Sequence, residues 1–114
     1  MFVFKRIQRI LNKAEYDYVF KKAQKIVTSD FIVLYRSNNL GHARLGLALS
    51  KKMIAKAHDR NRVKRLIRES FRLRQLPDLD IIFLAKPGVA KQDNSVFYTK
   101  LSKTWDQLIA YSNK

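Results

Sequence analysis

The sequence of 114 residues is strongly basic: 24 lysines and arginines against nine acidic residues give a net charge of +15 and a pI near 10.4. A hydrophobic content of 46% excludes an intrinsically disordered chain, and the lack of cysteine excludes disulfides and thiolate metal sites. The charge is spread along the chain, so we expect a polyanionic partner. A membrane surface is the weaker choice of polyanion, because the most apolar run, residues 81–85, is too short to span a bilayer. The length suits one domain, residues 1–114.

The N-terminal part combines an arm with a helix. Residues 1–11 mix basic and hydrophobic side chains without turn signals, and we interpret them as a flexible basic arm. They contain no cleavable apolar stretch, which predicts a cytoplasmic protein. Asn12 and Glu15 have the spacing of a capping box and predict a helix over residues 13–23. Tyr16 and Phe20 share one face of that helix, where they either pack in the core or form a surface on which an unpaired base stacks.

The next segments alternate like strands. Residues 26–37 are rich in β-branched and aromatic residues and predict one or two strands. Residues 43–50 carry leucines on one side and small residues on the other, which would admit an extended ligand close to the backbone. Residues 78–86 predict a buried strand, and a last helix is expected to begin with Asn94 or Ser95 as its cap. The order of elements implies an α+β sandwich, with one sheet and helices packed on it.

The most informative stretch runs from Asp59 to Gln75, where seven of seventeen residues are arginine or lysine. Its hydrophobic residues recur at helical spacing and predict a helix with one buried face. The opposite face offers Glu69 as almost its only acid, whereas a solvated face usually mixes both signs. We therefore predict a nucleic-acid-binding face. Its members are Asn61, Lys64, Arg65, Arg68 and Arg72.

No arrangement of residues suggests catalysis by the protein itself. The acidic residues are scattered, and Asp78 and Asp80 flank the start of a strand, where solubilising and capping roles are common. His42 and His58 have no serine or cysteine placed as a nucleophile. Three glycines cannot form a phosphate-binding loop. We predict no catalytic residue and no metal bound by the protein alone.

Residues 60–72, reading RNRVKRLIRESFR, closely resemble the RNR signature of the bacterial ribonuclease P protein subunit. Residues 44–47 (RLGL), 50–52 (SKK) and 85–88 (AKPG) also fit that family in order and spacing. So does the spacing of Tyr16, Val19 and Phe20, although the family usually has phenylalanine where this chain has Tyr16. The likeness covers roughly residues 10–110.

The resemblance implies a subunit of an RNA-containing enzyme that removes the 5′ leader from precursor tRNA by Mg²⁺-dependent hydrolysis. Mg²⁺ would act through the holoenzyme, whose chemistry resides on the RNA subunit. The fold implied is α-β-β-β-α-β-α with a left-handed βαβ crossover, against the usual rule. Residues implied to bind the catalytic RNA are Arg60, Asn61, Arg62, Lys64, Arg65, Arg68 and Arg72. Residues implied to bind the single-stranded leader, in a cleft between the first helix and the sheet, are Tyr16, Phe20, Tyr35, Ser50 and Lys52.

Composition alone equally supports a second function. A small basic ribosomal or ribosome-assembly protein would have the same charge, but it would bind ribosomal RNA and leave tRNA processing unchanged. The partners expected from the resemblance are the catalytic RNA and precursor tRNA, without a membrane or an obligate protein partner.

Overall fold

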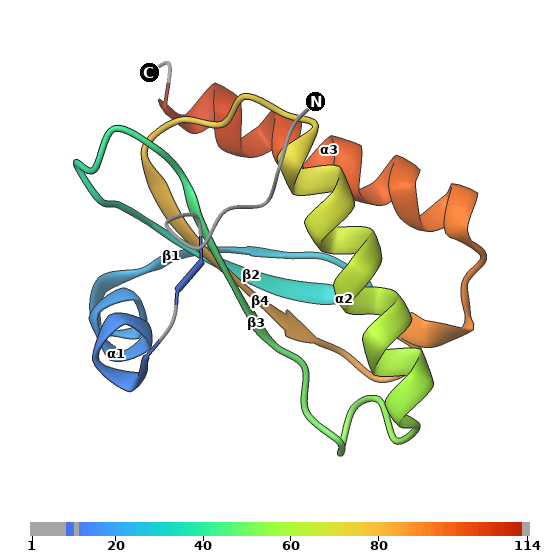
Figure 1. Ribbon diagram of the computed structural model, residues 1–114. Helices are drawn as coiled ribbons and strands as arrows, with labels where there is room; N and C mark the ends of the chain where they lie inside the picture. The colour runs from blue at the N-terminus through green and yellow to red at the C-terminus, as the bar shows by residue number, and fades with distance from the viewer. Residues whose placement is uncertain (1–8, 11, 113–114) are drawn as a thin grey trace.

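A computed structural model describes residues 9–10 and 12–112 of the chain (Figure 1). The predicted arm, residues 1–11, lies almost wholly outside the described residues. The elements in chain order are α1 (Lys13–Lys22), β1 (Gln24–Val27), β2 (Phe31–Ser37), β3 (Arg44–Ala48), α2 (Ala57–Arg72), β4 (Leu79–Ala85), the short 3₁₀ helix η2 (Val89–Lys91) and α3 (Asn94–Ser112). This order confirms the predicted α-β-β-β-α-β-α pattern.

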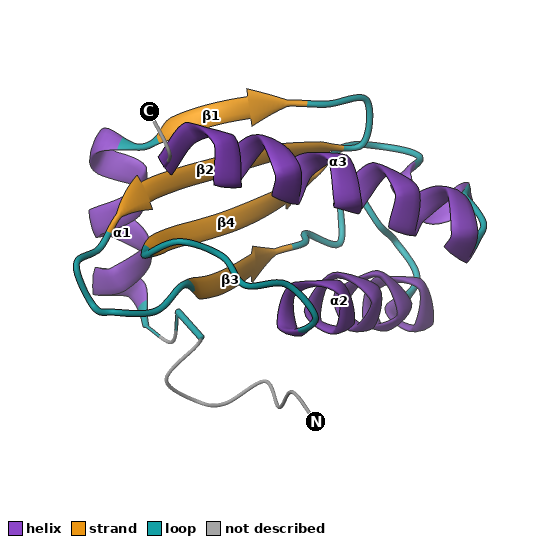
Figure 2. Cartoon of the chain, turned by 90° about the horizontal axis from the view of Figure 1, so that it is seen from above, coloured by secondary structure: helices purple, strands orange, loops and turns teal. Residues whose placement is uncertain are grey.

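The four strands form one mixed sheet in the order β1-β2-β4-β3. β2 is antiparallel to both of its neighbours, and β3 is parallel to β4. In Figure 2 the parallel strands run to the right, β4 lies above β3, and α2 connects them on the viewer's side of the sheet. This connection is left-handed, as the family resemblance implies and against the usual preference.

The helices divide the core in two. α2 and α3 cover one face of the sheet and α1 covers part of the other (Figure 1). Trp105 lies at the centre of the larger core, with ring centroids 5.4 Å from Phe83 and 5.9 Å from Phe71. Val19 of α1 and Ile82 of β4 belong to the smaller core under α1. Both faces of β4 are therefore buried, which explains its almost continuous apolar sequence.

The sequence predicts the N-terminal caps of α1 and α3, and the structure agrees with only the first. The capping box of α1 is confirmed: the Glu15 backbone N–H donates to Asn12 Oδ1 at 2.9 Å and the Asn12 N–H donates to Glu15 Oε1 at 3.3 Å. The predicted cap of α3 is wrong. Asp93 accepts from the Val96 N–H at 3.0 Å, because the helix begins one residue earlier than expected. This hydrogen bond lowers the pKa of the Asp93 carboxyl.

Candidate nucleic-acid interface

The outer face of α2 forms a shallow concavity of about 350 Å³. Helical spacing places its members side by side, while Val63, Leu66, Ile67 and Phe71 are buried on the opposite side of the helix. The residues that line the concavity are Asn61, Lys64, Arg65, Arg68, Glu69 and Arg72. We call this set the α2 face. It contains four cations and one acid on a helix whose buried side fixes its position.

The single acid of the α2 face is already engaged. Tyr98 of α3 donates its hydroxyl to Glu69 Oε2 at 2.7 Å, and Arg65 Nε lies 4.0 Å from the other carboxylate oxygen. Burial, followed by the bond to Glu69, raises the pKa of Tyr98, so this hydroxyl remains a donor at neutral pH. Glu69 therefore neutralises the four cations only in part.

Two residues implied by the resemblance to bind RNA also make hydrogen bonds within the protein. The Arg60 guanidinium donates to the carbonyls of Ile54 at 2.9 Å and Ala55 at 3.0 Å. That of Arg62 donates to the side chain of Asn94 at 2.8 Å, to the carbonyl of Gln92 at 3.2 Å and to the carbonyl of Ala90. Arg60 therefore holds the loop before α2, and Arg62 fastens α2 to the segment before α3. The other five members of the predicted set are gathered on the α2 face.

The aromatic residues of α1 take two different positions. Tyr16 is half-buried, and a Cβ atom at Gly46 would lie 2.9 Å from its hydroxyl oxygen and 3.0 Å from ring carbons. Only glycine at position 46 leaves room for this ring. The Tyr16 oxygen accepts from the Leu47 N–H of β3 at 3.1 Å. Phe20 is 45% exposed, with its ring 6.2 Å from that of Tyr16 and tilted by 31°. Phe20 offers the open aromatic surface, and Tyr16 is anchored to the sheet beside it.

Tyr35 does not face α1, so its predicted placement in a cleft between α1 and the sheet is wrong. Side chains of β2 alternate between the two faces of the sheet, and Tyr35 points to the core under α3. Its ring lies 4.9 Å from Tyr111 of α3, edge to face, and its hydroxyl donates to Gln24 at 3.4 Å. Burial raises its pKa. The residues of β2 that face α1 include Leu34 and Arg36.

Ser50 and Lys52 follow the end of β3 and are exposed. The Ser50 hydroxyl accepts from the Met53 N–H at 3.3 Å, and its carbonyl accepts from the N–H groups of Met53 and Ile54. This turn fixes the backbone between β3 and α2. Both side chains remain open to solvent at the end of the strand, so the structure neither buries them nor joins them to the two rings of α1.

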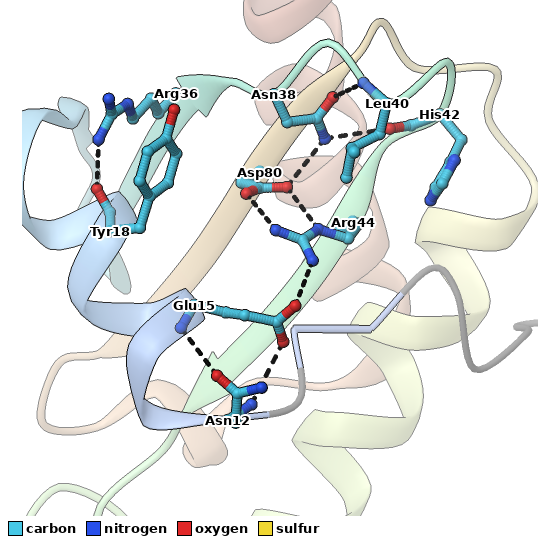
Figure 3. Close-up of polar contacts among 9 residues, drawn as sticks. All are labelled: Asn12, Glu15, Tyr18, Arg36, Asn38, Leu40, His42, Arg44 and Asp80. Atoms are coloured by element: carbon cyan, nitrogen blue, oxygen red, sulfur yellow. Dashed lines mark hydrogen bonds and ion pairs between the residues drawn. The ribbon is translucent and has the colours of Figure 1, made fainter.

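Arg44 forms a polar network that the sequence did not indicate (Figure 3). Its guanidinium contacts both carboxylate oxygens of Asp80, at 2.8 and 2.7 Å, and Glu15 Oε2 at 2.6 Å. Asn38 donates to Asp80 as well, at 2.8 Å. The hydrogen bonds to Asp80 raise the pKa of Arg44. The network ties the first turn of α1 to β3 and β4. Asp80, expected to be solubilising or capping, is instead completely buried and paired.

Within the part of the chain that the structure describes, no three His, Cys, Asp or Glu side chains gather into a possible metal site.

A model of the family described as ribonuclease P matches residues 4–109. The chain belongs to the ribonuclease P protein family. It is 62% identical over 114 residues to the ribonuclease P protein component of Legionella pneumophila (strain Corby), covering 100% of both chains. It is 45% identical over 113 residues to that of Haemophilus influenzae (strain PittGG), covering 97% of this chain and 95% of the relative.

Solved structures of ribonuclease P proteins have the same fold. A Staphylococcus aureus RNase P protein mutant with defective mRNA degradation activity matches with a TM-score of 0.81 and 26% identity, over 95% of this chain and 90% of that one. The RNase P protein of Thermotoga maritima matches with a TM-score of 0.77 and 26% identity, over 87% of this chain and 96% of that one. These matches support the expected α+β class.

Family membership decides between the two functions that composition left open. The chain is a protein subunit of ribonuclease P, the endoribonuclease of tRNA 5′ maturation, and not a ribosomal protein. Its partner in the holoenzyme is an RNA. In the described residues, no helix combines the length and apolar character needed to cross a membrane.

Proposed function

We propose that the chain contacts RNA through two chemically different surfaces. The α2 face binds the catalytic RNA subunit, and the α1 surface made by Phe20 and Tyr16 holds the single-stranded 5′ leader of precursor tRNA. Mg²⁺ acts in the RNA-containing holoenzyme, in the cytoplasm, and the protein contributes binding rather than catalytic groups.

The concentration of cations on the α2 face carries the first half of this proposal. Four basic side chains and one engaged carboxylate share the outer face of a helix whose other side is buried. Structured RNA is recognised largely by shape and backbone, so a fixed array of guanidinium groups suits it. Arginine also matches phosphate with two parallel hydrogen bonds, which lysine cannot provide.

The exposed ring of Phe20 carries the second half. A leader of variable sequence offers no constant pattern of base edges, but every base has a π-face that can stack on an aromatic ring. Phe20 leaves 45% of its surface open on a chain whose net charge is +15. Stacking together with positive charge is the usual way to hold a single strand without reading its sequence.

Replacing Phe20 with alanine should weaken binding of precursor tRNA to the reconstituted holoenzyme by about 1–3 kcal/mol, roughly five- to 150-fold, and leave mature tRNA binding unchanged. The measurement is the affinity of both RNAs by titration. Val96→Ala is the matched control, because Val96 is 43% exposed on α3. Equal losses for both RNAs would refute a role in leader binding, provided that circular dichroism shows both variants folded.

A further inference from the structure

The hydroxyl of Tyr16 lies at the free edge of β3. β3 is an edge strand of the sheet. The Leu47 N–H of this strand donates to the Tyr16 oxygen at 3.1 Å. The phenolic hydrogen has no acceptor within residues 9–10 and 12–112. A tyrosine hydroxyl can donate and accept at once. Tyr16 therefore completes the edge of the sheet and still has one hydrogen to donate to a ligand.

Two cations add positive charge near this edge. The chain at Arg9 forms a parallel bridge with Leu45, and the Ile10 N–H donates to the Leu45 carbonyl at 3.0 Å. Arg68 of the α2 face is close enough to both Arg9 and Tyr16 for them to influence its pKa, which burial lowers most and repulsion from Arg9 lowers further. No carboxylate forms an ion pair with Arg68 in the described part of the chain. Like charges held together in this way favour binding of an anion.

We propose that the hydroxyl of Tyr16 donates a hydrogen bond to one phosphodiester of the RNA backbone, with Arg9 and Arg68 adding positive charge nearby. The site rests on the proposed function, because it extends the proposed leader surface of Phe20 and Tyr16. Gly46 is part of the site, because only a glycine lets the Tyr16 ring lie against β3 with its hydroxyl at the strand edge. The neighbouring Phe20 ring makes the leader the expected source of the phosphate, although the RNA subunit could supply the same chemical group.

The hydroxyl changes what the edge of the sheet presents to a ligand. With phenylalanine at position 16, the Leu47 N–H at the strand edge would face solvent or the ligand. With Tyr16, the donor presented to the ligand is an O–H that reaches beyond the strand. A hydrogen bond to a charged acceptor is stronger than one between neutral groups. The inferred contact is thus a property of this chain and of relatives with tyrosine at this position.

The test compares Tyr16→Phe with the unchanged chain in reconstituted holoenzyme. Precursor tRNAs carry a neutral methylphosphonate at one leader position at a time, and their affinities are measured by titration. Tyr16→Phe should weaken binding of unmodified precursor by about tenfold. At one leader position, the neutral linkage should weaken binding of the precursor to the unchanged protein. At that position it should also abolish the difference in affinity between the two proteins. Tyr18→Phe, a tyrosine on α1 whose ring lies under Arg36, should behave like the unchanged protein.

Each outcome has a separate meaning. If Tyr16→Phe loses affinity for the isolated RNA subunit and none for the leader, the phosphate comes from the RNA subunit. If the tenfold loss persists with a neutral linkage at every leader position, and the RNA subunit is bound normally, the hydroxyl acts only by supporting the strand edge and the phosphate site is refuted. Unchanged affinities refute it too. Loss of leader binding in Phe20→Ala with no effect of Tyr16→Phe would overturn the phosphate site alone and leave the proposed function intact.

Discussion

Replacing Arg44 with alanine is expected to destabilise the folded chain by about 3–5 kcal/mol. The substitution leaves the Asp80 carboxylate, which is 0% exposed, without the two guanidinium contacts that compensate its burial. Among the residues that the structure describes, Asn38 alone would remain as a side-chain donor to it. A buried charge that loses its partner costs far more than the pair contributes when intact, so the effect should be large. Urea unfolding of the free protein, followed by circular dichroism, measures it.

Arg74→Ala is the matched control for this prediction. Arg74 also forms an ion pair with an aspartate, but the side chain of that residue, Asp106, is 67% exposed. Exposed pairs contribute at most about 1 kcal/mol. A loss for Arg44→Ala no greater than the loss for Arg74→Ala would contradict the structural role of the network. Because Arg44 also holds Glu15, the first variant should loosen α1 from the sheet before the rest of the fold opens.

The second large effect is expected on the α2 face. Changing Arg65 and Arg72 together to glutamine should weaken binding of the catalytic RNA by about 1.5–3 kcal/mol for each guanidinium. Neutralised phosphates release counterions, so the slope of log affinity against log salt should become shallower by about 2. Affinities measured between 50 and 200 mM salt, a range that spans physiological conditions, give both quantities.

The control for this pair removes the same charge elsewhere. Lys21 of α1 and Lys103 of α3 are exposed and lie outside the α2 face. Changing both to glutamine should reduce affinity only slightly and leave the salt slope nearly unchanged. An unchanged slope in the arginine variant, or an equal change in both variants, would show that general charge rather than the α2 face binds the RNA.

Much of the fold could be predicted from the sequence because local patterns specify it. The capping box of Asn12 and Glu15 and the apolar spacing of α2 each depend on residues within a few positions of one another, and both are confirmed. The placement of Tyr35 was wrong for a different reason. Alternation along a strand separates two faces but does not say which helix covers each face.

Several contacts that the sequence missed join distant segments. Arg62 sits within the RNR signature like its neighbours, but its acceptors lie about 30 positions away, at Ala90, Gln92 and Asn94. Asp80 lies at the edge of an apolar run, as a capping residue would, and only the pairing of β3 with β4 brings Arg44 to it. Helical spacing groups charges on a face, but it cannot say which of them turn inward.

The most direct measurement is cleavage of the 5′ leader from a precursor tRNA by a bacterial ribonuclease P RNA, at near-physiological Mg²⁺, with and without this protein. We predict strong stimulation by the protein and no cleavage by the protein alone. Absence of stimulation, with circular dichroism showing the protein folded and the RNA active at high Mg²⁺, would contradict its action as the protein subunit of that enzyme.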